Sequence, residues 1–412
     1  MRKINLSIDK LWDYNLYAIA LFPLLPRAVE SILMLLFFIL SIIVFVNKKG
    51  SHIEEKVVQK VFLFSSVFVL YVVGSFYSAN NKESINFITR TAPLLMFPLA
   101  IGVLAKEKIN KNRLKNILKT YVISLVVALV CIHLYLYKST INLPNWEYRK
   151  AFEKITDVHG TYFSLWISFG VLILFWNIFN LRKTKKKQII LISIVLISYL
   201  VYWQIVLSAR LPFLATLLLV LSFFIYKIKN THLRFYTLLG VIGVCIGLFF
   251  LNQKTIINKF DFSLPKGDYH LQHRTITSEH IRGGIYHCSF NLASKKLFFG
   301  YGIGDVNDTL NKCYVEEIDT NVYQILQYNT HNQYMQIMLS SGIVGLLLFV
   351  ISLFVALKAS YKMQYKLYLL FNVLLIICFM TENILSRHDG VLFYSFFNSI
   401  FAFYLIGKEI KE

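Results

Sequence analysis

Residues 329–349, NTHNQYMQIMLSSGIVGLLLF, join a polar segment directly to an apolar run that is long enough to cross a membrane. The polar segment, residues 252–332, interrupts a chain that otherwise consists mostly of apolar runs of membrane length. Because hydrocarbon offers no water to the backbone, each apolar run satisfies its own hydrogen bonds only as a helix. The sequence therefore predicts an all-α polytopic membrane protein with its chemistry gathered at one long polar loop.

The composition supports this class. Of the 412 residues, 56% are hydrophobic and 16% are charged, which is too apolar for a soluble domain. The runs are too long for barrel strands and lack their alternation. We count about twelve spans, with Pro23 and Pro26 interrupting the first short run. They lie at 13–26, 29–46, 61–77, 85–104, 117–137, 160–180, 188–207, 211–226, 233–251, 333–356, 367–383 and 390–406.

The positive charge of the chain follows its topology. The net charge is +21, but Lys and Arg gather in alternate connections, such as KEKINKNRLKNILK at 106–119 and LRKTKKK at 181–187. The positive-inside rule makes these connections cytoplasmic, together with both termini, and puts residues 252–332 on the outward side. A nucleic-acid partner is not indicated, because the charge marks one side of a membrane.

Three regions result from this topology. Residues 1–251 hold spans one to nine, residues 252–332 form an outward loop module with short amphipathic helices, and residues 333–412 hold spans ten to twelve. The large loop thus lies between spans nine and ten. We expect it to lie on the membrane surface rather than to form an independent soluble domain.

Helix signals in the loop module are local. Thr277 or Ser278 is placed to cap a helix that ends near Lys296, because apolar residues recur there at helical spacing. Residues Gly300–Gly304 predict a tight turn, since the strand and spacing of a nucleotide-binding loop are missing. Asp305 is then placed to cap a second short helix.

The cysteine pattern predicts no metal site. Cys288 and Cys313 lie in the outward loop, where a disulfide is allowed, although sequence alone does not establish its geometry. Three others, Cys131, Cys245 and Cys378, fall in apolar runs and act as small apolar side chains. Because Cys/His metal spacings are missing, we expect neither a metal nor a cofactor.

Two arginines stand at the outward ends of spans. Arg210, in VLSARLPF, and Arg90, in NFITRTAPLL, are placed at membrane depth. A guanidinium there is costly and usually has an anionic partner or ligand. Arg210 is expected to bind such a ligand, with a helix-end anchor as the alternative. Arg90 has the same two readings, with Glu382 or a backbone carbonyl as a partner inside the chain.

The loop module adds cations of its own. Arg282, in SEHIRGGIYHC, has the planar fork that binds phosphate through two hydrogen bonds. Taken alone, an arginine there is more often a solvated surface residue, and Arg274 has that reading. Lys295 and Lys296 are further rivals for a phosphate contact.

His331 immediately precedes a span. Thr330 or Asn332 is placed to cap the helix that follows, whose positive end favours a neutral imidazole. A neutral imidazole is suited to act as a general base toward a hydroxyl, and the alternative is an interfacial histidine that only packs. Other polar residues near outward turns are candidates for the lining of the same cavity: His159, Asn332, Glu382, Asn383, Arg387, His388 and Asp389.

Three motifs together resemble the O-antigen ligase and polymerase superfamily of bacterial envelope enzymes. They are RGGIYHCSFNLASKKLFFGYGIGDVND at 282–308, NTHNQYMQIMLSSGIVGLLLF at 329–349 and TENILSRHDGVLFYSFF at 381–397. The resemblance covers roughly residues 200–412 by motif and the earlier spans by their number and topology. It implies a metal-independent, inverting glycosyltransferase of the bacterial inner membrane, whose large loop faces the periplasm.

The resemblance also implies roles for residues. The donor would be a glycan on undecaprenyl diphosphate, and the acceptor lipid A-core or another glycan. Arg210 and Arg282 would hold the pyrophosphate, with Arg90 as a further substrate contact, and His331 would take the proton of the acceptor hydroxyl. Membrane lipids surround the protein, and no cofactor is implied.

Two other functions stay open at this stage. A polysaccharide polymerase shares these motifs and differs in joining two carrier-linked glycans. A membrane transporter also has many spans, but transporters place polar groups near the bilayer midplane and show repeated halves. Here the polar residues gather at the outward interface, which favours the glycosyltransferase.

Overall fold

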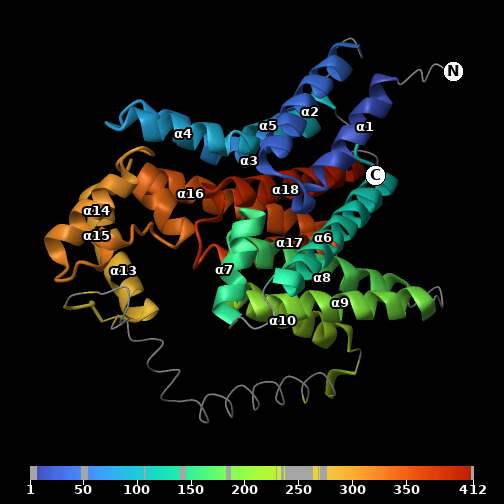
Figure 1. The fold of residues 1–412 in the computed structure, drawn as a ribbon. Helices are drawn as coiled ribbons and strands as arrows, with labels where there is room; N and C mark the ends of the chain where they lie inside the picture. Colours follow the sequence, from blue (N-terminus) through green and yellow to red (C-terminus); the bar gives the residue numbers. More distant parts are fainter. Residues whose placement is uncertain are drawn as a thin grey trace.

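The structure, a computed structural model, describes residues 7–47, 54–105, 108–139, 145–181, 187–228, 230–232, 236, 263–267, 269 and 276–409. In these ranges all regular elements are helices, which confirms the all-α class (Figure 1). Among the described residues, eight helices are long and apolar enough to cross a membrane. They are Arg27–Asn47 (α2), Glu55–Ser75 (α3), Asn81–Leu104 (α4, α5 and η2), Lys111–Tyr137 (in α6), Gly160–Phe179 (in α8), Lys187–Leu207 (α9), Arg210–Lys227 (α10) and Gln333–Lys362 (α16).

The remaining predicted spans differ in kind. The run at 233–251 lies outside the described residues, apart from Tyr236. The first run forms α1 (Ile8–Ile19) and the short η1 (Phe22–Leu24) around Pro23, and the run at 367–383 forms α17 (Lys366–Cys378), which ends before the polar residues. The last run lies in α18 (His388–Glu409). Eight spans are supported, and the count of twelve stays a prediction.

Helix α18 forms the centre of the bundle. Its side chains Phe393, Phe397 and Phe401 are fully buried, and Figure 1 shows the helix running through the middle of the bundle. Aromatic rings pack edge to face there, with Phe169 of α8 4.8 Å from Phe397 between ring centroids. A helix that is apolar all round is expected at such a centre.

Three helices form a loop module at one end of the bundle. They are α13 (Ser278–Lys295), α14 (Val306–Glu317) and the single turn α15 (Val322–Ile325). The hydroxyl of Thr277 accepts the N–H of His280 at 3.3 Å, which confirms the predicted cap. The buried cluster under the module continues into Met338 and Leu339 of α16, so the module is built onto that helix.

The predicted glycine turn joins the module to α16. Tyr301 N–H donates to the carbonyl of Leu339 at 2.7 Å, and Gly302 N–H donates to that of Ser340 at 3.0 Å. Both carbonyls are accessible because α16 breaks at Gly342, where φ is 66°. A Cβ at Gly342 would meet the Phe298 carbonyl oxygen at 2.1 Å, so this residue has to be glycine.

The expected cap by Asp305 is wrong. Asp305 does precede α14, but its carboxylate accepts no hydrogen bond from that helix. It accepts the backbone N–H groups of Ala79 and Asn80, each at 2.8 Å. The carboxylate therefore ties the glycine turn to the connection between α3 and α4, a long-range contact that local sequence does not indicate.

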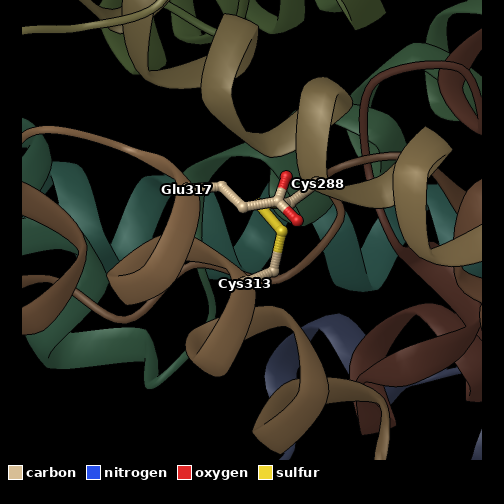
Figure 2. Close-up of side chains that lie close together, drawn as sticks. All are labelled: Cys288, Cys313 and Glu317. Carbon is tan, nitrogen blue, oxygen red and sulfur yellow. A yellow bond between two sulfur atoms is a disulfide. The ribbon is translucent and has the colours of Figure 1, made fainter.

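Cys288 of α13 and Cys313 of α14 form a disulfide, with Cα atoms 5.9 Å apart (Figure 2). The double change Cys288→Ser with Cys313→Ser is expected to lower the unfolding free energy of the loop module by about 3 kcal/mol, because the bond restricts the unfolded chain. Limited proteolysis of purified protein in detergent measures this. Cys131→Ser, at an exposed cysteine outside the module, is the control. Equal cleavage rates for all three proteins would contradict the prediction.

Candidate active site

His331 lies in the turn that leads into α16. Its backbone has φ 43°, an unusual value for a residue with a side chain. The Asn332 amide oxygen accepts the N–H groups of Tyr334 at 2.9 Å and Met335 at 3.2 Å. Asn332 therefore caps α16, one of the two predicted alternatives, and its amide oxygen is used in the cap. The side chain of His331 is 30% exposed at the open end of the helix.

Glu382 faces His331 from the connection between α17 and α18. The distance from His331 Nδ1 to Glu382 Oε2 is 3.7 Å, and the Glu382 side chain is only 16% exposed. This is longer than a hydrogen bond. His331 Nδ1 is buried and has no hydrogen-bond partner within the part of the chain that the structure describes. The carboxylate is therefore the nearest acidic neighbour of this nitrogen.

Three other side chains affect the pKa of Glu382. Burial raises the pKa of Glu382, but the neighbouring His331, His159 and Arg282 together outweigh it and bring the pKa below the usual value. His159 comes from the turn before α8, and Arg282 comes from the first turns of α13. The electrostatic effect on this carboxylate therefore comes from side chains in three other parts of the chain.

His159 is neutral near pH 7. Burial lowers its pKa, and Arg149 and Arg387 lower it further, against the opposing effect of Glu153 and Glu382. The nearest acidic atom is Glu153 Oε1, 3.9 Å from His159 Nε2. A neutral imidazole there offers both a hydrogen-bond donor and an acceptor.

Arg210 begins α10 and is exposed. Its charge acts on Glu279 of α13. Burial raises the pKa of Glu279, but hydrogen bonds from its own N–H and from Ser278, together with the charge of Arg210, bring the pKa below the usual value. Glu279 stands one turn before Arg282. Both arginines therefore lie in the first turns of their helices, Arg210 in α10 and Arg282 in α13.

A narrow apolar pocket lies between α8, the first turn of α10 and the connection between α17 and α18. It is lined by Thr161, Tyr162, Leu165, Pro212, Cys378, Thr381, Glu382 and Ile384. Pro212 lies two residues after Arg210, so the first turn of α10 and the connection between α17 and α18 line the same pocket.

Residues 204–350 match the family described as O-antigen ligase. The chain carries an O-antigen ligase domain. This match confirms the resemblance that the three motifs indicated, and it implies a glycosyltransferase-like enzyme that acts on lipid-linked glycans. No curated protein matches the chain.

The O-antigen ligase domain contains Arg210, Arg282 and His331 but ends before Glu382. Arg387 also lies outside it and is exposed, with its guanidinium 5.8 Å from the ring centroid of Tyr162. Both residues outside the domain belong to the connection between α17 and α18. The site is therefore completed by the closing helices of the chain.

Arg90 is placed differently from the other predicted arginines. Its Nη1 donates to the carbonyl of Ser386 at 3.1 Å, and its guanidinium lies 5.8 Å from the Phe87 ring centroid. A backbone carbonyl was one of its two predicted partners. Ser386 lies four residues after Glu382, so Arg90 supports the same connection that carries Glu382.

Two other sequence-predicted residues, His388 and Asp389, contact α2 instead. His388 Nε2 lies 2.8 Å from Glu30 of α2, and the Asp389 carboxylate accepts from Arg27 of the same helix at 2.8 Å. These ion pairs fix the start of α18 to α2. Arg274, the rival loop arginine, lies outside the described residues.

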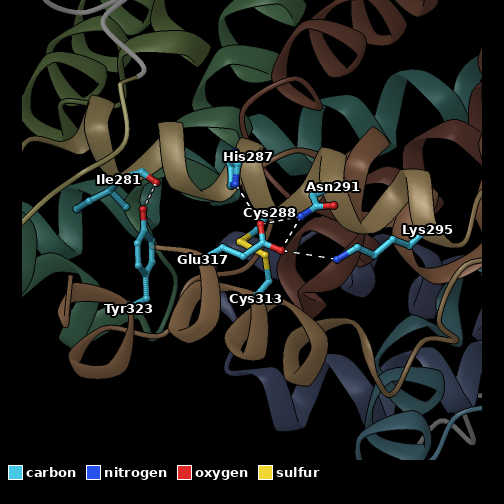
Figure 3. The surroundings of a disulfide bond; sticks show 8 residues. All are labelled: Ile281, His287, Cys288, Asn291, Lys295, Cys313, Glu317 and Tyr323. Atoms are coloured by element: carbon cyan, nitrogen blue, oxygen red, sulfur yellow. Dashed lines mark hydrogen bonds and ion pairs between the residues drawn. A yellow bond between two sulfur atoms is a disulfide. The ribbon is translucent and has the colours of Figure 1, made fainter. Parts of the chain in front are cut away.

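The described residues bring one group of possible metal ligands together, Cys288, Cys313 and Glu317 (Figure 2). Its two sulfur atoms are bonded to each other, so neither is a thiolate. Glu317 lies beside Asn291, His287 and Lys295, with its carboxylate 3.1 Å from His287 Nε2 and 3.6 Å from Lys295 Nζ (Figure 3). The Asn291 amide lowers the pKa of Glu317 most, and His287 and Lys295 lower it further against burial. The cluster therefore braces α13 against α14.

The sequence did not indicate that two polar side chains of α16, Gln333 and Gln336, contact the connection between α17 and α18. Gln333 and Gln336 are almost fully buried. The Gln333 amide oxygen accepts the N–H of Leu385 at 2.7 Å. Gln333 and Gln336 are three residues apart and therefore share a face of α16. Two glutamines at this spacing in an apolar run were the feature of the sequence that could have indicated a buried polar contact. Both bind the α17–α18 connection to the turn that carries His331.

Proposed function

We propose that the protein is a glycosyltransferase that moves a glycan from undecaprenyl diphosphate to an acceptor hydroxyl, without a metal and with inversion at the anomeric carbon. The observation that carries this proposal is the 3.7 Å approach of His331 Nδ1 to Glu382 Oε2, at the edge of residues that match the O-antigen ligase family. Cations suit a pyrophosphate, and an imidazole suits a hydroxyl proton.

The arginines act on the donor in this proposal. Arg210 and Arg282 bind the diphosphate oxygens, and their fixed charges stabilise the negative charge that grows as the glycosidic bond breaks. Planar guanidinium groups make paired hydrogen bonds to such oxygens. The leaving group is undecaprenyl diphosphate itself, so no sugar nucleotide is required.

His331 acts on the acceptor. The acceptor oxygen attacks the anomeric carbon, the bond from that carbon to the diphosphate breaks, and the hydroxyl proton passes to the imidazole. His331 Nδ1 faces Glu382, which leaves Nε2 to receive the proton. The Glu382 carboxylate then stabilises the imidazolium that forms. A single displacement of this kind inverts the anomeric centre.

The proposed setting is the periplasmic face of a bacterial inner membrane, with both termini in the cytoplasm. It follows from the distribution of Lys and Arg among the connections. We propose lipid A-core as the acceptor, which makes the protein a ligase. The polymerase, whose acceptor is another carrier-linked glycan, is supported by the same domain.

The experiment that tests the function compares a deletion strain with the same strain carrying the wild-type gene. Surface glycans and carrier-linked glycans are separated by gel and identified by mass spectrometry. Polymer that accumulates on the carrier, with none on lipid A-core, supports the ligase. Single repeat units support the polymerase, and unchanged glycans in both strains would refute a glycosyltransferase.

A further inference from the structure

The side chain of Asn383 contacts the residues on both sides of His331. Its amide oxygen accepts the hydroxyl of Thr330 at 2.9 Å and the backbone N–H of Asn332 at 2.7 Å. Asn383 and Thr330 are both almost fully buried. These two hydrogen bonds therefore hold the ends of the turn at fixed positions, shielded from competition with solvent.

The orientation of the Asn383 amide is itself fixed. Its nitrogen donates to the amide oxygen of Gln336 at 3.1 Å, and Gln336 is also buried. The backbone carbonyl of Asn383 accepts the hydroxyl of Tyr162 at 3.0 Å. One residue of the α17–α18 connection thus joins α8, α16 and the His331 turn.

The turn needs such support because His331 has a left-handed backbone, with φ 43°. A residue with a side chain keeps this conformation only when its surroundings impose it. Without the two hydrogen bonds to Asn383, the backbone would relax toward a commoner conformation. The imidazole would then turn away from Glu382, whose Oε2 lies 3.7 Å from His331 Nδ1.

We propose that Asn383 is a positioning residue that holds His331 in the orientation required for proton transfer, a proposal that rests on the function proposed above. It binds no substrate and acts only through the His331 turn. Its loss therefore affects the chemical step and leaves donor binding intact. This separates it from the arginines, which contact the donor.

The test measures transfer by purified protein in nanodiscs, with a carrier-linked glycan as donor. Asn383→Ala is expected to lower kcat about a hundredfold, with the donor KM within about twofold of the wild-type value. Asn383→Asp keeps an acceptor for Thr330 and Asn332, and Gln336 has only to rotate its amide to donate to it. The aspartate is therefore expected to recover a large part of kcat.

The control is Asn372→Ala, which removes another buried asparagine hydrogen bond, to the Tyr368 carbonyl at 2.9 Å, outside this network. It is expected to keep kcat even if its melting temperature falls as much as that of Asn383→Ala. The proposal is refuted if Asn383→Ala keeps kcat while His331→Ala is inactive, or if Asn372→Ala loses as much activity. If the wild type itself transfers no glycan, the proposed function fails instead.

Discussion

Replacing His331 with alanine is expected to lower glycan transfer by a factor of about 10² to 10⁴, the usual contribution of a general base. The loss follows from the proposed mechanism, because the acceptor hydroxyl then has no group to take its proton. Donor binding remains, since the arginines are untouched. The measurement is kcat with purified protein, together with the glycans of a complemented deletion strain at equal protein level.

The matched control for this change is His133→Ala. His133 lies in α6 and stacks on Tyr199, with ring centroids 6.2 Å apart, away from the site. This variant is expected to transfer glycan as the wild type does. Full activity of the His331→Ala protein would rule out His331 as the base, and the turn would then have only a structural role.

Replacing Arg282 with alanine is expected to lower kcat by a factor of about 10² to 10³, as the removal of one group that stabilises transition-state charge commonly does. Lysine at this position keeps the charge but loses the planar fork, so Arg282→Lys is expected to recover only part of the rate. Arg210→Ala has a similar expected effect. Initial rates at several donor concentrations separate the change in kcat from that in KM.

Two controls sharpen the arginine experiment. Lys295→Ala removes a cation that lies on the same helix and pairs with Glu317 at 3.6 Å, so it is expected to keep its activity. Arg274→Ala tests the rival loop arginine. Loss of transfer in Arg274→Ala together with full transfer in Arg282→Ala would reverse the assignment of the phosphate contact.

Helices and their ends were the most predictable part of the fold. Apolar runs in a membrane have one stable backbone form, and the caps at Thr277 and Asn332 depend on residues within three positions. The break at Gly342 and the link from Asp305 to Ala79 were not predictable. Both depend on which distant segments meet, and no local pattern contains that information.

The sequence indicated several residues of the candidate site, but it did not indicate which of them contact one another. Arg282 was a candidate because its planar fork suits phosphate, and His331 because a neutral imidazole before a span is suited to act as a base. Their relation to Glu382 and Asn383 depends on the fold of the closing helices. A carboxylate or an amide that follows a helix has many possible partners, so sequence did not separate the site residue Glu382 from Asp389, which pairs with Arg27 instead.

The disulfide between Cys288 and Cys313 also bears on when this part of the protein reaches its folded form. Arg282 lies on the same helix as Cys288, so the bond that fixes this helix also fixes the loop arginine. Thiols pair in oxidising compartments and stay reduced in the cytosol. On the periplasmic side that we propose for this loop, the bond forms only after the segment has crossed the membrane, so Arg282 is fixed in place only at that stage.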